Sequence, residues 1–72
     1  MIFPQYRKLS NHKSFYKILS KEVFEEIQLV GTVSMKTKTT ATKYPEILRI
    51  KDMLDGVAPF EMSTEAEYHS YQ

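Results

Sequence analysis

Residues Ser14 to Val30 read SFYKILSKEVFEEIQLV, and the change of pattern at Ser20 decides the fold that the sequence predicts. Before Ser20, successive side chains alternate between two faces, as they do along a pleated strand. After Ser20, apolar residues recur at helical spacing, which predicts a helix from Lys21 to about Val30. Its apolar stripe consists of Val23, Phe24, Ile27 and Val30. We expect Ser20 to cap this helix and Gly31 to end it.

The residues before this segment predict a second strand, joined to the first as a β-hairpin. Residues 2–9 alternate loosely, and Pro4 confines that strand to a sheet edge or delays its pairing. A polar turn follows over residues 10–13, in which Asn11 tolerates the left-handed conformation that a tight turn requires.

The second half of the chain predicts another strand and a second helix. Residues 32–42 are rich in threonine and place Val33 and Met35 on one face, with Lys36 and Lys38 on the other. Pro45 suits the first turn of a helix that ends near Gly56. The apolar stripe of this helix consists of Ile47, Leu48, Ile50, Met53 and Leu54.

Residues 60–72 contain few apolar side chains, and two interpretations of them stay open. Residues 60–62 form a short strand or an extended lead-in. Residues 63–72 form a short helix or a mobile acidic tail, and Thr64 and Glu67 have the spacing of a helix capping box.

These segments predict an α+β fold in the order ββαβα, followed by a short strand and a short helix. We expect one domain spanning residues 1–72, with a small, mainly antiparallel sheet of three or four strands and two helices packed on one face. A chain of 72 residues buries only about 60 to 65% of the surface that its unfolded form exposes, so help from a partner is expected.

Composition excludes two common ways of stabilising a small domain. The chain has no cysteine and two histidines, so neither a disulfide nor a structural zinc site is expected. No apolar run approaches the roughly 18 residues of a membrane span, and the first residues lack a secretory signal pattern. We therefore expect a cytoplasmic protein without a membrane partner.

Charge is distributed unevenly along the chain. All ten lysines and arginines lie within residues 7–51 with four acids, a net charge of +6, whereas residues 52–72 hold five acids and no lysine or arginine, a net charge of −5. Either these two parts neutralise each other, or the basic part binds a polyanion. The candidate polyanion-binding residues are Arg7, Lys8, Lys13, Lys36, Lys38 and Lys43.

Two binding functions compete for the first half of the chain. Lysines interleaved with aromatic residues on a sheet are typical of single-strand nucleic-acid binders, although a pI near 8.0 is below the usual value of about 9 for such domains. The alternative is a protein interface, because large apolar residues occur on both faces of the hairpin. The candidate interface residues are Tyr6, Phe15, Tyr16 and Ile18. The preferred hypothesis is a self-associating interaction or regulatory module, a homodimer or a complex with another protein.

Catalytic and metal-binding patterns are weak in this sequence. His12 falls in the expected turn and His69 in the terminal segment, and neither belongs to a recognised catalytic motif. Glu22, Glu25 and Glu26 form an acidic cluster without a nearby histidine, which favours a solvated face over a metal site. The sequence predicts no catalytic residue and no cofactor, and we expect a non-enzymatic protein.

Two segments resemble small uncharacterised bacterial proteins. They are YRKLSNHKSFYKILS followed by VFEEIQLVG, within residues 6–31, and YPEILRIKDML at residues 44–54. The resemblance covers about half of the chain and implies a bacterial cytoplasmic protein. No activity is attached to those proteins, so it assigns no role to any residue.

Overall fold

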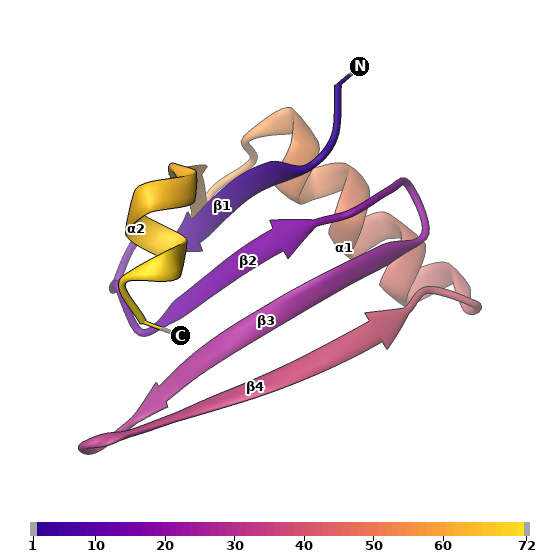
Figure 1. Cartoon of the computed structure of the whole chain (residues 1–72). Helices are drawn as coiled ribbons and strands as arrows, with labels where there is room; N and C mark the ends of the chain where they lie inside the picture. The colour runs from indigo at the N-terminus through magenta and orange to yellow at the C-terminus, as the bar shows by residue number, and fades with distance from the viewer. Residues whose placement is uncertain (1, 72) are drawn as a thin grey trace.

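The computed structural model describes residues 2–71 and contains one five-stranded antiparallel sheet with two helices. The elements in chain order are β1 (Gln5–Leu9), β2 (Ser14–Ile18), β3 (Val23–Val30), β4 (Val33–Thr40), α1 (Tyr44–Asp55), β5 (Phe60–Met62) and α2 (Glu65–His69). The strand order across the sheet is β4-β3-β2-β1-β5 (Figure 1). The α+β class and the antiparallel sheet are confirmed, but the sheet has five strands where the sequence predicts three or four.

Strand β3 replaces the helix expected from Lys21 to Val30, and this is the main correction to the predicted fold. Its residues pair with β2 on one side and with β4 on the other. Phe24 packs in the core beneath α1, whereas Ile27 packs in the core beneath α2. Apolar residues therefore occur on both faces of β3, and their spacing coincides with that of a helical stripe.

The two residues expected to bound that helix instead form turns. The Ser20 hydroxyl oxygen accepts hydrogen bonds from the backbone N–H groups of Glu22 and Val23, at 3.1 and 3.2 Å, and closes the β2–β3 connection. Gly31 has a φ of 62° and stands first in the two-residue turn between β3 and β4. Type II′ hairpin turns favour glycine at this place. Serine and glycine mark helix ends and hairpin turns alike, so these signals did not separate the two.

The hairpin of β1 and β2 is confirmed, with a correction in its turn. His12 adopts the left-handed conformation, with a φ of 60°, in place of Asn11. The Asn11 side-chain oxygen instead accepts a hydrogen bond from the Lys13 N–H at 2.9 Å.

Helix α1 matches the prediction for residues 45–56. Pro45 lies in its first turn, and Gly56 ends it with a φ of 70°, its N–H donating to the Met53 carbonyl oxygen at 3.2 Å. Among the described residues, no helix is long and apolar enough to cross a membrane.

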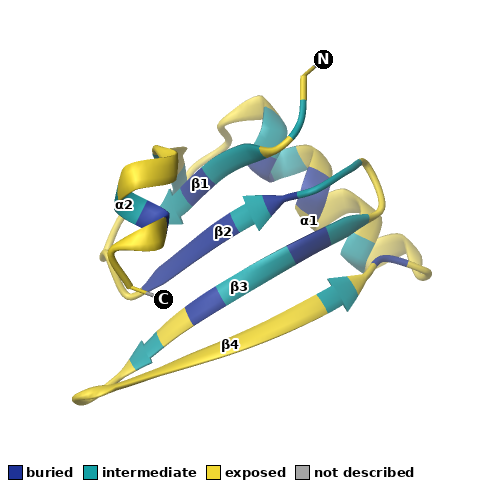
Figure 2. Cartoon of the chain, viewed as in Figure 1, coloured by how far each residue is buried: buried dark blue, intermediate teal, exposed yellow. Residues whose placement is uncertain are grey.

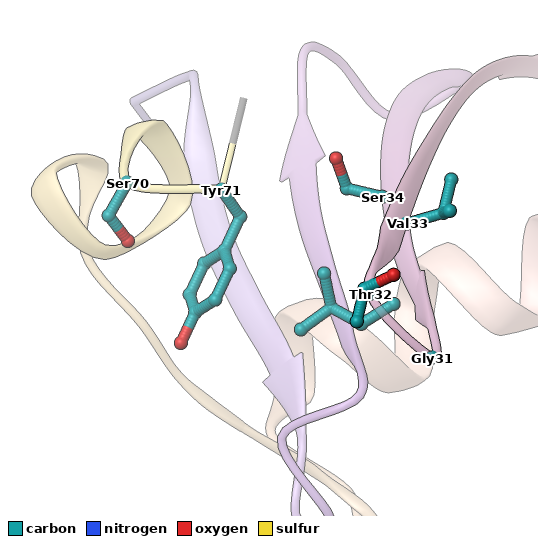
Figure 3. Close-up of a pocket in the computed structure, with 7 residues that line it drawn as sticks. Gly31, Thr32, Val33, Ser34, Ser70 and Tyr71 are labelled. Carbon is teal, nitrogen blue, oxygen red and sulfur yellow. The ribbon is translucent and has the colours of Figure 1, made fainter.

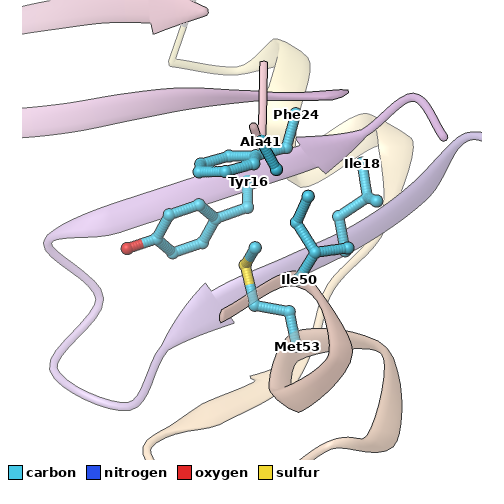
Figure 4. Close-up of a cluster of buried hydrophobic side chains, with 6 residues drawn as sticks. All are labelled: Tyr16, Ile18, Phe24, Ala41, Ile50 and Met53. Carbon is cyan, nitrogen blue, oxygen red and sulfur yellow. The ribbon is translucent and has the colours of Figure 1, made fainter. Parts of the chain in front are cut away.

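The expectation of two helices on one face fails because the first of them, expected from Lys21 to Val30, is strand β3. The two helices that form, α1 and α2, lie on opposite faces of the sheet. Helix α1 lies behind the sheet in Figure 1 and α2 in front of it. We call these the α1 face and the α2 face. The core of the α1 face consists of Tyr16, Ile18, Phe24, Ala41, Ile50 and Met53 (Figure 4). The core of the α2 face consists of Phe15, Ile27 and Tyr68, with Tyr6 and Leu29 packed against it.

This two-sided arrangement follows from the alternation in β2. Phe15 and Tyr16 are adjacent, so they point to opposite faces, and both are buried. Two large aromatic side chains on opposite faces require cover on each side. The short α2 supplies that cover through Tyr68, which is fully buried. Of the two alternatives for the terminal segment, a short helix or a mobile acidic tail, the short helix forms, at Glu65–His69.

Candidate functional site

Arg7 does not belong to the polyanion-binding surface for which it was a candidate. Its side chain is buried on the α1 face, where Nε donates to the Met53 carbonyl oxygen at 2.7 Å and Nη2 to that of Leu54 at 3.3 Å. These carbonyls lie at the C-terminal end of α1, where helix carbonyls lack intrahelical partners and the helix dipole favours a cation. Burial lowers the pKa of the Arg7 guanidinium. The Arg7 side chain therefore joins β1 to the end of α1 and is not exposed to a polyanion.

The candidate lysines divide between two environments. Lys43 is the N-cap residue of α1, and its N–H donates to the Glu46 carboxylate at 3.3 Å. Lys8 forms an ion pair of 3.2 Å with Glu67 of α2, which joins the basic part of the chain to its acidic part. A hydrogen bond from Ser63 and the pairing with Lys8 lower the pKa of Glu67.

Lys36 and Lys38 lie together on the α2 face of β4. They stand opposite Ile27 and Glu25 of β3, respectively, and both are exposed. The Lys36 ammonium lies 3.5 Å from the Glu25 carboxylate. Glu25 also accepts a hydrogen bond of 3.3 Å from the Tyr68 hydroxyl, whose pKa is raised mainly by burial. Lys13 is exposed on the β1–β2 turn.

Three of the four candidate interface residues are buried in this chain. Phe15, Tyr16 and Ile18 are at most 1% exposed, so they offer no surface to a partner. Tyr6 is half-buried and its ring lies 5.7 Å from that of Tyr68. The expected interface is therefore corrected: the apolar excess on the hairpin is covered by the chain's own helices.

Three of the exposed apolar side chains lie near the turn of the β3–β4 hairpin. Val30, Val33 and Met35 are 52, 59 and 53% exposed. All three side chains lie on the α1 face. Val30 is an even number of residues from Phe24 along β3, so the two share a face. Val33 and Met35 of β4 pair with Val30 and Gln28, which lie on that face. This end of the hairpin extends past the part of the sheet that α1 covers (Figure 1). We call Val30, Val33 and Met35 the apolar strip.

The outer edge of β4 is open along its eight residues. Within residues 2–71, no strand pairs with this edge. The Ala41 N–H donates to the Glu22 carbonyl oxygen at 2.6 Å. This bond shows which residues of β4 bond to β3, namely those an even number of positions from Ala41. Because bonded residues alternate in an antiparallel ladder, every second residue of β4 directs its N–H and C=O groups away from β3. These outward residues are Ser34, Lys36, Lys38 and Thr40. Figure 2 shows β4 as exposed and β2, on the other side of β3, as largely buried.

A shallow hollow of about 320 Å³ lies between the β3–β4 turn and the end of α2 (Figure 3). Thr32, Ser34 and Ser70 contribute hydroxyl groups to it, and Tyr71 lines one wall while stacking on Phe15 at 4.3 Å between ring centroids. No histidine, carboxylate or lysine is among the residues that line it. A second hollow of about 370 Å³, beside α1, is lined by Ile47, Ile50, Leu54, Lys21, Lys51 and Asp55.

The two histidines lie at separate places. His12 is exposed in the β1–β2 turn, and His69 Nε2 lies 3.7 Å from the Glu65 carboxylate on α2. Among residues 2–71, no group of three or more histidine or carboxylate side chains is arranged to hold a metal ion.

No family model, curated protein or solved structure matches this chain. The open edge of β4 and the apolar strip beside it are the features of the described residues that point to a function.

Proposed function

We propose that this chain is a non-enzymatic protein-interaction module that binds an extended segment of another protein along the outer edge of β4. The observation that supports this proposal is the open, eight-residue edge of β4. An extended peptide gains main-chain hydrogen bonds when it adds a strand to such an edge, and its alternate side chains supply specificity.

The surroundings of the edge favour a specific partner over nonspecific pairing. The apolar strip lies along the same hairpin and gives one face of an added strand something to bury against. Lysines on an edge strand oppose indiscriminate pairing between sheets. Lys36 and Lys38 lie on the other face of β4, where their charges oppose pairing with an unrelated sheet edge.

A peptide-display selection tests the proposal without a known partner. Random extended peptides are selected against the chain, and their contacts are mapped by amide chemical shifts. We expect shifts concentrated at residues 34–40. Selected peptides that bind instead beside α1, at the hollow lined by Ile47 and Leu54, would contradict the proposal.

One backbone substitution identifies the edge itself. Lys36→Pro removes an outward N–H, and proline is tolerated on edge strands, so the fold should persist. We expect binding of selected peptides to weaken by about tenfold or more, because a main-chain hydrogen bond is lost and the proline ring obstructs the edge. Lys36→Ala is the matched control, since it removes the same side chain and keeps the N–H. Equal effects of the two substitutions would show that the backbone edge does not carry binding.

A further inference from the structure

We infer that the segment added to β4 is acidic at alternate positions and apolar at the positions between them. This inference rests on the proposed function and specifies the chemistry of its partner. It follows from how the two kinds of side chain on β4 are sorted between the two faces of the strand.

The outward-facing backbone groups belong to the residues whose side chains lie on the α2 face. Lys36 and Lys38 are among them. Residues directly opposite each other on neighbouring strands place their side chains on the same face, about 4.5 to 5.5 Å apart at Cβ. Side chains of an added strand opposite these lysines therefore lie beside the two ammonium groups. Carboxylates there form favourable cross-strand pairs.

The intervening side chains of the added strand lie on the α1 face. Val33 and Met35 occupy that face of β4, followed by Thr37. Val33 and Met35 are both more than half exposed, so apolar side chains opposite them remove apolar surface from water. Apolar and acidic residues are therefore favoured at alternate positions of the partner.

The same sorting disfavours a second copy of this chain as the added strand. Two β4 strands paired antiparallel in one continuous sheet would place the lysines of both copies on one face. Like charges opposite each other are destabilising. Glu25 lies near Lys36 and opposite Lys38, so each copy has one carboxylate to neutralise two lysines and a net positive charge remains. The edge thus favours an acidic partner over its own copy.

Labelled peptides as long as β4 test this inference by fluorescence anisotropy. The first alternates Glu with Val and Thr. In the second Gln replaces Glu, in the third Lys replaces Glu, and the fourth has the composition of the first with all Glu grouped at one end. We expect the first peptide to bind about tenfold more tightly than the second, from two opposite-charge pairs, and the third to bind most weakly. Added salt should reduce this preference, because exposed charges are screened.

A pair of matched double variants assigns the preference to the edge. Lys36→Gln with Lys38→Gln should remove most of the preference for Glu over Gln. Lys21→Gln with Lys51→Gln changes the net charge equally, beside α1, and should leave the preference intact. Amide shifts of the first peptide's complex should centre on residues 34–40.

The outcomes separate this inference from the proposed function. If the Gln peptide binds at β4 as tightly as the Glu peptide, the acidic partner is wrong and strand addition stands. If no peptide shifts the amides of β4, both are wrong. If the grouped peptide or a single-stranded oligonucleotide binds as tightly as the alternating peptide, the lysines form a general polyanion surface and the inference fails.

Discussion

The hairpins β1–β2 and β3–β4 share the alternating pattern of antiparallel strands, yet their second strands lie in opposite environments. Phe15, Tyr16 and Ile18 of β2 are at most 1% exposed, because α1 covers one face of β2 and α2 the other. Strand β4 is exposed along nearly its whole length (Figure 2). The difference shows that helix cover, rather than strand pattern, determines which part of the sheet stabilises the fold and which part is available to a partner.

The largest expected effect comes from removing the cover of the α2 face. Tyr68→Ala should lower the free energy of unfolding by about 4 kcal/mol, as for other buried aromatic residues replaced by alanine. Urea denaturation measures this change. Tyr44→Ala, at a tyrosine that is 71% exposed, is the control and should change stability by less than about 0.5 kcal/mol. A loss below about 1 kcal/mol for Tyr68→Ala would mean that α2 does not stabilise the covered part of the sheet around β2.

Arg7→Leu tests the tie between β1 and the end of α1. It should cost about 2 kcal/mol, because the carbonyls of Met53 and Leu54 lose a charged donor in a buried place. The same denaturation experiment measures the loss, with Lys21→Leu as an exposed control. If both substitutions had equal effects, the guanidinium would not contribute to the stability of the covered region.

Gly31→Ala tests the turn of the exposed hairpin. Alanine is strained at a φ of 62°, so a cost of about 1 to 2 kcal/mol is expected. An added Cβ meets no atom within 4 Å, so the cost is conformational rather than steric. Amide hydrogen exchange should accelerate in β3 and β4 more than in β1 and β2. Thr32→Ala is the control, and a uniform acceleration would argue against a separate response of this hairpin.

The smallest effect is expected for the apolar strip. Val33→Thr and Met35→Thr, made together, should change the free energy of unfolding by less than about 0.5 kcal/mol per site, since both side chains are mostly in water. The same variant should weaken peptide binding at β4. A large loss of stability without a loss of binding would reverse the roles assigned to the two hairpins.

Helix α1 could be predicted from local sequence because its signals are specific. Pro45 begins it, Gly56 ends it, and the apolar stripe between them fits no strand. Strand β4 was likewise predictable, since Val33 and Met35 alternate with Lys36 and Lys38 and have no helical spacing.

Strand β3 could not be predicted in the same way. Phe24 and Ile27 are three residues apart, which suits one helix face and equally suits opposite faces of a strand that is buried on both sides. The choice depends on α2, which lies about 40 residues later and supplies the second cover. Tertiary packing therefore decided what local spacing left open.

The candidate site could be predicted only in part. Alternation correctly placed Lys36 and Lys38 on one face of β4. It could not show that β4 lies at the edge of the sheet, because strand order depends on contacts between distant segments. Nothing local to Arg7 distinguishes it from the neighbouring Lys8, although one is buried at a helix end and the other is ion-paired to α2.

The strand order also has a consequence for how the chain folds. Strands β1, β2 and β3 each pair with the next strand along the sequence, so their ladders close short loops. Hairpins of this kind form in about 1 to 10 μs, and proteins rich in local contacts fold faster than those built from distant pairings. Among the elements of residues 2–71, β5, on the far side of β1, and the two helices are the ones that require long loops to close. We expect the four-stranded meander to form first, with β5 and α2 docking last.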